Sequence, residues 1–331
     1  MKRSLLAAVA AALLIANQSS AEDIQPAVVY DLGGKFDKSF NESAHDGAEK
    51  FKAETGIDYR DFEVQNDSQR EQALRNFARR GLSPIVAIGF SQANAVEKVA
   101  TEFPDLKFAI VDMVVDLPNV RSIVFKEHEG SYLVGLLAAM ASESGKVGFV
   151  GGMDIPLIRR FACGYAQGAK ATRDGLVVLQ NMTGTTGAAW SDPAKGGELA
   201  KSQFDQGADV VYHAAGGTGM GVLQAAADAG KLGIGVDSNQ NGLHPGSVLT
   251  SMLKRVDVAV ASAFKDAMDD KWTAGFYVLG LAEDGVDWAL DDNNKDLITD
   301  EMKSAVDQAK ADIIAGKIEV HDYMADKTCP Y

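Results

Sequence analysis

The sequence predicts an α/β protein with two doubly wound lobes, each built on a parallel sheet. Short apolar segments alternate with segments of helical periodicity along most of the 331 residues, an order typical of parallel sheets with helices on both faces. The alternation starts again at Lys146, after a first series of strands that ends at Phe125. Two half-sheets of similar build are therefore expected, near residues 22–125 and 146–248.

The first half-sheet begins with the apolar strand Ala27–Tyr30. Short apolar runs between turn residues are typical of buried parallel strands. Leu74 and Phe77 fall on one face of a predicted helix, which suits a helix packed on a sheet. Further strands are expected at 59–64, 84–89, 107–112 and 120–125, and helices at 69–80, 91–103 and 127–143, after a first helix that runs to about residue 54.

The second half-sheet begins with the strand 146–152, which ends in a glycine pair. Asp192 and Pro193 have the residue types of a helix cap and first turn. Strands are expected at 176–180, 209–213, 232–237 and 248–253, and helices at 157–172, 192–206, 218–229, 256–271 and 299–315.

The N-terminus has the pattern of a secretory signal peptide. Lys2 and Arg3 precede the apolar segment 5–16, and small residues suit a cleavage site after about Ala21. We expect residues 1–21 to be removed and the product to be periplasmic; a retained N-terminal anchor is the alternative. No Cys stands at the cleavage point, so no lipid anchor is expected.

The charge of the chain limits its partners. The formal charge of −14 becomes −16 once Lys2 and Arg3 are removed. An acidic surface argues against binding to nucleic acid or to anionic membranes. The length is sufficient for two lobes with full cores.

The two cysteines, Cys163 and Cys329, lie far apart in the sequence. They can pair in an oxidising compartment. Cys163 falls in an apolar helical pattern, however, so we expect a buried thiol and keep the disulfide as the alternative.

The first candidate site is the loop from Asp31 to Gly47, which joins the first strand to its helix. Ligands of doubly wound sheets lie beyond the carboxyl ends of the strands. Phe40 is a large aromatic residue where the chain should be exposed, and Ser39 or Asn41 is expected to cap the helix. The alternative is an ordinary turn in which Phe40 covers the helix end.

Aspartates end three of the apolar strands, namely Asp31, Asp112 and Asp237. A carboxylate at a strand end can accept hydrogen bonds from a neutral polar ligand. Ser91 follows the strand 84–89 at the same edge and also has the residue type of a helix cap. Capping or solvation of the loops is the alternative role for each aspartate.

Two side chains in the second half of the chain, Trp190 and Lys254, are also expected to contact a ligand. Trp190 lies in a Gly/Thr-rich loop, where it could enclose a flat ring together with Phe40. Lys254 ends a strand and could donate to a hydroxyl group. The alternatives are a tryptophan packed on its own loop and a solvated surface lysine.

The glycine-rich segment 216–221 follows a strand and opens a helix. Its spacing differs from the dinucleotide-binding pattern G-x-G-x-x-G, so we expect a backbone that a ligand can approach closely, with nucleotide binding as the alternative. No P-loop, zinc-protease or nucleophile-elbow motif occurs, and the histidines show no metal-ligand spacing. No cofactor and no metal site are expected.

The sequence resembles the basic membrane protein family of ABC-transporter substrate-binding proteins, of the purine nucleoside receptor type. The resemblance covers nearly all of the chain after residue 21. The matching motifs are D-x-G-G-x-x-D-x-S-F-N at 31–41, IVD at 110–112, E-x-x-G-S-Y-L-x-G at 127–135, GKVGFVGG at 145–152, P-x-I-x-x-F-x-x-G-Y-x-x-G at 156–168, AAGGTGxG at 214–221, GVDSNQ at 235–240 and TSMLKRVD at 250–257.

The resemblance implies a type I periplasmic-binding fold with two lobes joined by three crossovers, and no catalysis. The lobes would comprise 22–127 with about 250–275, and 128–249 with about 276–331. The implied ligand-binding residues are Asp31, Phe40, Asn41, Ser91, Asp112, Phe161, Trp190, Gly216, Asp237 and Lys254. Phe40 and Trp190 would stack on the base, Asn41 and Asp112 would lie near it, and Asp237 and Lys254 would bind the ribose.

Trp190 stands where members of the family usually carry Phe, which puts the pocket shape in doubt but preserves stacking. Many members also carry a lipidated cysteine that this chain lacks.

We therefore expect a protein that captures a nucleoside, with a purine base, and delivers it to the permease subunits of an ABC importer, and that acts as a monomer. The alternatives are a binding protein for a sugar or another small polar metabolite, and a nucleoside hydrolase or phosphorylase. Inosine, guanosine, adenosine and cytidine are not ranked by the sequence.

Overall fold

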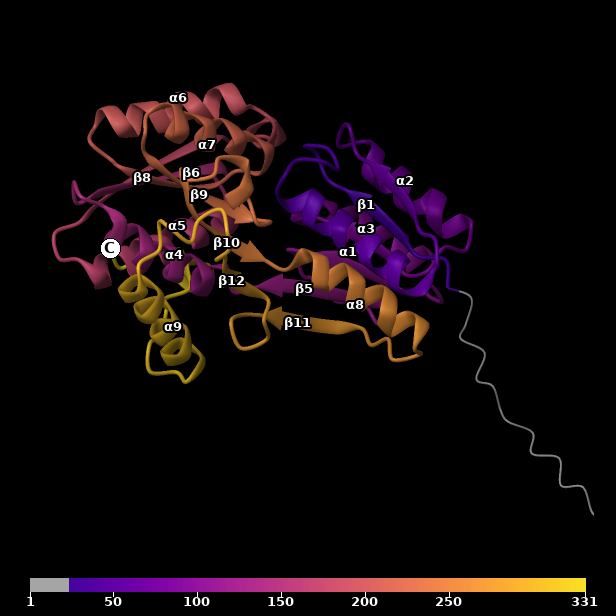
Figure 1. Ribbon diagram of the computed structural model, residues 1–331. Coiled ribbons are helices and arrows are strands. Elements are labelled where there is room, and N and C mark those ends of the chain that lie inside the picture. The colour runs from indigo at the N-terminus through magenta and orange to yellow at the C-terminus, as the bar shows by residue number, and fades with distance from the viewer. Residues whose placement is uncertain (1–23) are drawn as a thin grey trace, which may run out of the picture.

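The computed structural model describes residues 24–331, and these residues form two six-stranded sheets. The expected signal peptide and its cleavage site lie outside the described residues. The first sheet has the order β11-β5-β4-β3-β1-β2 and the second β12-β10-β9-β8-β6-β7. All pairs are parallel except β10–β12. Two doubly wound lobes are thus confirmed, and they lie side by side in Figure 1.

The strands of the first sheet are β1 (Ala27–Tyr30), β2 (Arg60–Glu63), β3 (Ile85–Ile88), β4 (Phe108–Val111), β5 (Val120–Phe125) and β11 (Gly275–Leu279). Those of the second are β6 (Lys146–Met153), β7 (Val177–Gly184), β8 (Val210–Ala214), β9 (Leu232–Asp237), β10 (Val248–Lys254) and β12 (Val286–Trp288).

The first lobe carries the helices α1 (Phe40–Thr55), α2 (Gln69–Arg79), α3 (Ala93–Glu102) and α8 (Val256–Met268). The second carries α4 (Glu127–Ala141), α5 (Pro156–Thr172), α6 (Pro193–Asp205), α7 (Gly219–Asp228), α9 (Asp300–Ile314) and the short α10 (Tyr323–Asp326). Short 3-10 helices stand at Phe90–Gln92, Gly187–Trp190, Gly216–Thr218 and Asn241–Leu243.

Alternate side chains of each strand enter different cores. Val28 and Tyr30 pack with residues of α1 and α8, whereas Ala27 and Val29 pack with residues of α2 and α3. Successive side chains of a strand point to opposite faces of the sheet, so helices cover both faces. This explains why β1 is apolar at every position.

The chain crosses between the lobes three times, near residues 126, 255 and 280. The backbone N–H of Lys126 donates to the carbonyl of Leu279, and that of Arg255 donates to Gly285. The crossing segments therefore lie next to one another and form the hinge. In Figure 1, α8 and β11 lie with the N-terminal elements although they come late in the chain.

The strand pairing places β10 in the second sheet and β11 in the first. We therefore propose that the first lobe comprises 24–126 and 255–280 and the second 127–254 and 281–331. Strand β11 was missed because it is an edge strand after a polar turn. Its Phe276 and Val278 side chains are exposed, and its neighbour in the sheet, β5, is remote in the sequence.

The expectation of a buried thiol at Cys163 is wrong, because Cys163 and Cys329 form a disulfide with their Cα atoms 5.7 Å apart. The bridge joins α5 to the C-terminal segment across 166 residues of sequence. The apolar pattern of α5 identified the burial of Cys163 correctly but could not place the distant partner beside it.

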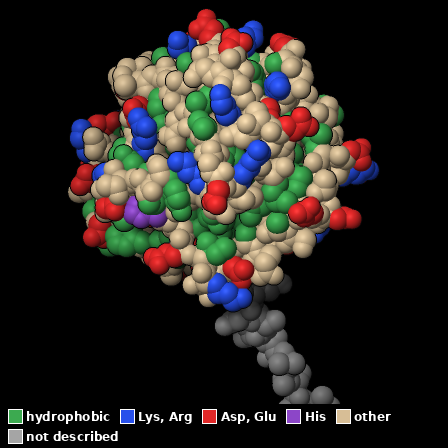
Figure 2. All heavy atoms as spheres, turned by 90° about the vertical axis from the view of Figure 1, so that its left-hand side faces the viewer, with side chains coloured by type: hydrophobic (Ala, Val, Ile, Leu, Met, Phe, Trp, Pro, Cys, Tyr) green, Lys and Arg blue, Asp and Glu red, His purple; other side chains and the backbone are tan. Residues whose placement is uncertain are grey.

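No helix among residues 24–331 is long and apolar enough to cross a membrane. On the face of the described residues in Figure 2, basic and acidic side chains are interspersed rather than gathered by sign.

Candidate functional site

The candidate site is a cavity between the two lobes, at the carboxyl ends of strands from both sheets. Nine of the ten residues that the sequence nominated line this cavity, and they are Asp31, Phe40, Asn41, Asp112, Phe161, Trp190, Gly216, Asp237 and Lys254. The tenth, Ser91, lines a neighbouring cavity in the outer part of the cleft. Residues separated by more than two hundred positions thus meet at one place.

Asp31 is held by groups of its own lobe. Its carboxylate accepts hydrogen bonds from Arg70 Nη2, at 2.6 Å, and from the hydroxyl of Ser91. The backbone N–H of Asp31 donates to Asn41 Oδ1 at 3.1 Å. A Cβ on Gly89 would lie 2.5 Å from Asp31 Oδ2, so only glycine leaves room there. Ser91 therefore orients Asp31 instead of facing the inner cavity.

Asp37 caps α1, where the sequence indicated Ser39 or Asn41. Its carboxylate accepts the backbone N–H groups of Ser39, Asn41 and Glu42 at 2.9, 3.1 and 3.1 Å, and the Ser39 side chain makes no capping bond. Burial raises the pKa of Asp37 to about 6, although these three hydrogen bonds oppose the shift. Asp37 also lines the cavity. Its place just before the predicted helix start is the signal that identifies a cap.

Lys254 is buried, so the alternative of a solvated surface lysine is excluded. Its ammonium lies 2.7 Å from Asp112 Oδ2 and 2.9 Å from Glu127 Oε1. It also lies 5.1 Å from the ring centre of Phe40 and 5.6 Å from that of Phe161. Burial alone would lower the pKa of Lys254, but the two carboxylates raise it above its usual value.

The direct ion-pair partners of Lys254 are Asp112 and Glu127, while Asp237 acts on it as a further charge. Lys254 ends β10 beside the hinge, where it reaches Asp112 of the first lobe and Glu127 at the start of α4. Sequence reasoning missed Glu127 as a site residue. The signal was available, because Glu127 opens the motif E-x-x-G-S-Y-L-x-G directly after a predicted strand.

Asp112 and Asp237 occupy matching places in the two lobes. Asp112 follows β4 and Asp237 is the last residue of β9, and both have positive φ values, 71° and 64°, a conformation uncommon outside glycine and tolerated by aspartate. Burial raises the pKa of each carboxyl to about 6, while Lys254 opposes the shift. Oδ1 of Asp112 is buried and makes no hydrogen bond within residues 24–331.

Trp190 packs on glycine at the end of β6. A Cβ on Gly152 would lie 2.1 Å from Cζ3 of the indole, so Gly152 makes room for the ring. Gly216, at φ 55°, lies beside the Trp190 backbone and side chain. The indole thus packs outside its own loop and also lines the cavity.

The lobes touch each other across the cavity. Ser39 Oγ donates to Asp237 Oδ2 at 2.5 Å, and Ser238 Oγ donates to the carbonyl of Ser39 at 2.9 Å. Gln240 Nε2 donates to the carbonyl of Lys38 at 2.7 Å. The loop 31–41 therefore closes directly onto the end of β9.

Within residues 24–331, no three His, Cys, Asp or Glu side chains are grouped as a metal site would require. The polar groups of the cavity are carboxylates, one ammonium and one amide. Such a set can accept hydrogen bonds from hydroxyl groups, and the aromatic rings can contact a flat apolar face.

The chain resembles solute-binding proteins in both sequence and structure. It is 36% identical to the ABC transporter nucleoside-binding protein BmpA of Lactococcus lactis, over 90% of this chain and 89% of the relative. It is 35% identical to an uncharacterized lipoprotein of Pyrococcus furiosus, over 83% and 72%. A crystal structure of ABC transporter solute-binding proteins from Aeropyrum pernix superposes with a TM-score of 0.82 at 30% identity, over 89% of this chain and 92% of that one.

These likenesses agree with the type I periplasmic-binding fold expected from the sequence. A family model for ABC transporter substrate-binding proteins of the PnrA-like type matches residues 24–323. The chain therefore belongs to the Bmp family of PnrA-like ABC transporter substrate-binding proteins.

Proposed function

We propose that this protein captures a nucleoside with a purine base in the cavity between its lobes and presents it to the permease of an ABC importer. The observation that carries the proposal is a cavity between the lobes that is lined by both aromatic rings and carboxylates. A nucleoside has a flat base at one end and a diol at the other. The nucleoside-binding name of the relative from Lactococcus lactis supports the same ligand class.

In this proposal the base lies between Phe40 and Trp190. Asn41, with Asp31 behind it, and the free oxygen of Asp112 are placed to read the edge of the base. Stacking on aromatic side chains contributes about 1–3 kcal/mol per base and tolerates different bases. Polar contacts at the edge must therefore supply any preference for purines.

The ribose lies against Asp237, with the backbone of Gly216 nearby. A carboxylate can accept from two vicinal hydroxyl groups, and such charge-assisted bonds are the stronger ones. Lys254 lies among Asp112, Glu127 and the rings of Phe40 and Phe161, where it balances part of the negative charge. The carboxylates around the cavity outnumber its cations, which favours a neutral nucleoside over an anionic nucleotide.

Mass spectrometry of the ligand released on denaturing purified protein tests the proposal. The expected species is a nucleoside. Titration calorimetry with inosine, guanosine, adenosine, cytidine and ribose then ranks the ligands. Release of a sugar, or tighter binding of ribose than of any nucleoside, would support the sugar-binding alternative instead.

The family is one of substrate-binding proteins, and we propose that this chain performs no catalysis. Incubation with inosine, with and without phosphate, followed by chromatography for hypoxanthine, separates a receptor from a hydrolase or phosphorylase. Release of base on repeated turnover would contradict the proposal.

We further propose a periplasmic protein that is cleaved after about Ala21, carries no lipid and is monomeric. Recovery of the protein from the periplasmic fraction tests its location, the intact mass tests the cleavage and the lack of lipid, and light scattering after size exclusion tests the monomer. A mass that includes acyl chains would place the protein with the relatives named lipoproteins.

A further inference from the structure

Glu127 joins the cavity to a second buried cation. It is the first residue of α4, and its side chain is fully buried. One carboxylate oxygen, Oε1, lies 2.9 Å from the ammonium of Lys254, and the other, Oε2, lies 2.9 Å from Nη1 of Arg160. Lys254 lines the cavity, whereas Arg160 does not. Glu127 therefore connects the cavity with a region behind it.

Arg160 in turn binds the C-terminal segment. Its Nε and Nη2 atoms donate to the two carboxylate oxygens of Asp322, both at 2.7 Å, and Nη1 also donates to the carbonyl of Phe125 at 2.7 Å. A guanidinium fork that holds a carboxylate at two points fixes both groups. The sequence of contacts is Asp322–Arg160–Glu127–Lys254–Asp112, which we call the ion-pair chain.

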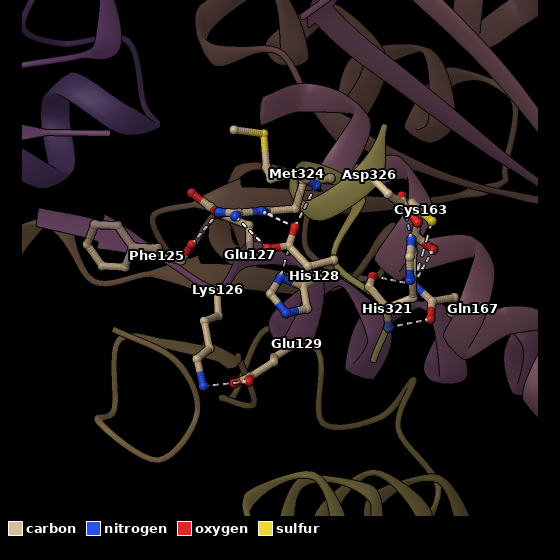
Figure 3. A network of polar contacts seen from close by, with 12 residues as sticks. Phe125, Lys126, Glu127, His128, Glu129, Cys163, Gln167, His321, Met324 and Asp326 are labelled. Carbon is tan, nitrogen blue, oxygen red and sulfur yellow. Dashed lines mark hydrogen bonds and ion pairs between the residues drawn. The ribbon is translucent and has the colours of Figure 1, made fainter. Parts of the chain in front are cut away.

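The ion-pair chain runs through the hinge. Phe125 ends β5 and Glu127 begins α4, so both stand at the first crossing between the lobes, and Lys254 stands just before the second. Asp112 belongs to the first lobe and Asp322 to the second. Figure 3 shows the side chains of Glu127 and His128 next to each other, with Gln167 and His321 farther along the same helical region.

The C-terminal segment is fixed beside Arg160. Gln167 Nε2 donates to the carbonyl of His321 at 2.9 Å, and the N–H of His321 donates back to Gln167 Oε1 at 2.8 Å. The Cys163–Cys329 disulfide ties the same segment to the same helix, α5. Asp322 therefore follows directly after His321, which is anchored to α5.

The positive charges of Lys254 and Arg160 keep Glu127 ionised, and this affects the position of Lys254 in the cavity. Burial favours the neutral form of Glu127, but Lys254 and Arg160 together hold the pKa of this carboxyl below its usual value. An ionised Glu127 holds one side of the Lys254 ammonium. If Arg160 lost its position, Glu127 would be a buried carboxylate with a single partner, and Lys254 would shift.

We infer that Asp322, Arg160 and Glu127 are positioning residues for Lys254, so that the C-terminal segment forms part of the ligand-binding apparatus. This inference rests on the proposed nucleoside-binding function. It assigns to residues outside the cavity, and to the C-terminal segment that the disulfide anchors, a role in the affinity for the ligand.

The test compares Asp322→Asn with Asp154→Asn by calorimetry with inosine. Asp154 holds the neighbouring Arg159 in the same two-point manner, at 2.7 and 2.8 Å, but that pair does not reach Glu127. We expect Asp322→Asn to weaken inosine binding about 3- to 30-fold and Asp154→Asn to leave it unchanged. Binding of hypoxanthine, which lacks the ribose, should change little in either variant. Circular dichroism melting confirms that both variants are folded.

A double-mutant cycle with Lys254→Met separates positioning from a general structural effect. Once Lys254 is replaced, Asp322→Asn should weaken inosine binding no further. Equal losses with and without Lys254, or inosine binding by Asp322→Asn like that of the wild type, would overturn the inference. Failure of the wild-type protein to bind inosine, guanosine, adenosine or cytidine would instead contradict the proposed function.

Discussion

At the scale of single residues, the cavity brings together groups that are charged and also buried. Three charged side chains, those of Lys254, Asp112 and Asp237, line the cavity, and each is less than a tenth exposed. Buried charges persist where they have partners. Lys254 has two carboxylates and Asp237 has the hydroxyl of Ser39, so a ligand enters a site whose charges are already oriented.

Replacement of Asp237 tests the ribose end of this site. Asp237→Ala removes an acceptor for both hydroxyl groups, while Lys254 keeps its other two partners. Hydrogen bonds to charged groups contribute roughly 1.5–3 kcal/mol each, so we expect a loss of about 3–5 kcal/mol, or about a hundredfold to several thousandfold in affinity. Calorimetry with inosine measures it. Hypoxanthine binding should be nearly unaffected. An unchanged affinity for inosine would mean that Asp237 does not bind the ribose hydroxyl groups.

Acid should weaken binding through the same carboxyl group. Burial raises the pKa of Asp237 to about 6 in the free protein, whereas ligand hydroxyls favour its ionised form. Affinity for inosine should therefore fall as the pH falls through about 6, by at most tenfold per pH unit for one proton. Asp37 and Asp112 titrate in the same range, so Asp237→Asn should flatten the profile only in part. A profile identical to that of the wild type would exclude Asp237 as the linked group.

At the scale of secondary-structure elements, the end of β6 decides where Trp190 lies. Gly152 of this strand lies against the indole, and a Cβ there would overlap the ring. The neighbouring strand β7 ends in Gly184, where a Cβ would lie 3.6 Å from that of Ala189, which is ordinary contact. An added methyl group is therefore tolerated at the end of β7 but not at the end of β6.

Gly152→Ala should push the indole of Trp190 into the cavity. Overpacking costs about 1–3 kcal/mol, and here it competes directly with the base. We expect weaker binding of both inosine and hypoxanthine in calorimetry. Gly184→Ala is the matched control and should bind both ligands normally. Normal binding by Gly152→Ala would mean that Trp190 does not contact the base.

The contact between α5 and the C-terminal segment should also support stability. Cys329→Ser removes a cross-link that closes a loop of 166 residues in sequence separation. We expect the free energy of unfolding to fall by about 2–4 kcal/mol, measured by denaturant titration. Dithiothreitol should destabilise the wild type to the level of the variant and leave the variant unchanged. Equal stability of oxidised wild type and variant would contradict this expectation.

At the scale of the whole molecule, two lobes on three adjacent crossings form a hinge that closes on a ligand. The contacts of Ser39 with Asp237 and of Gln240 with Lys38 join the lobes at the mouth of the cavity. Small-angle X-ray scattering should give a smaller radius of gyration with saturating inosine than without it. Gln240→Ala should require more inosine for the same change. An unchanged radius in the wild type would indicate lobes that do not move.

The architecture and most of the cavity lining could be predicted from the sequence. Apolar strands that alternate with helices require a parallel sheet with two covered faces, and the carboxyl ends of parallel strands meet at one edge. Asp31, Asp112 and Asp237 could therefore be assigned to the cleft from their places after strands. Phe40 and Trp190 were identified because large aromatic residues are unusual in glycine-rich loops.

The tertiary structure decided which of these groups are partners. Glu127 reaches Lys254 because two crossings of the hinge lie side by side, and Cys329 reaches Cys163 because the C-terminal segment returns to α5. The lobe assignment of β10 and β11 likewise depends on which edge of a sheet each strand joins. Local patterns describe burial and periodicity over a few residues, whereas the contacts of Glu127 with Lys254, of Cys163 with Cys329 and of β11 with β5 join residues more than a hundred positions apart and form only when the whole chain packs.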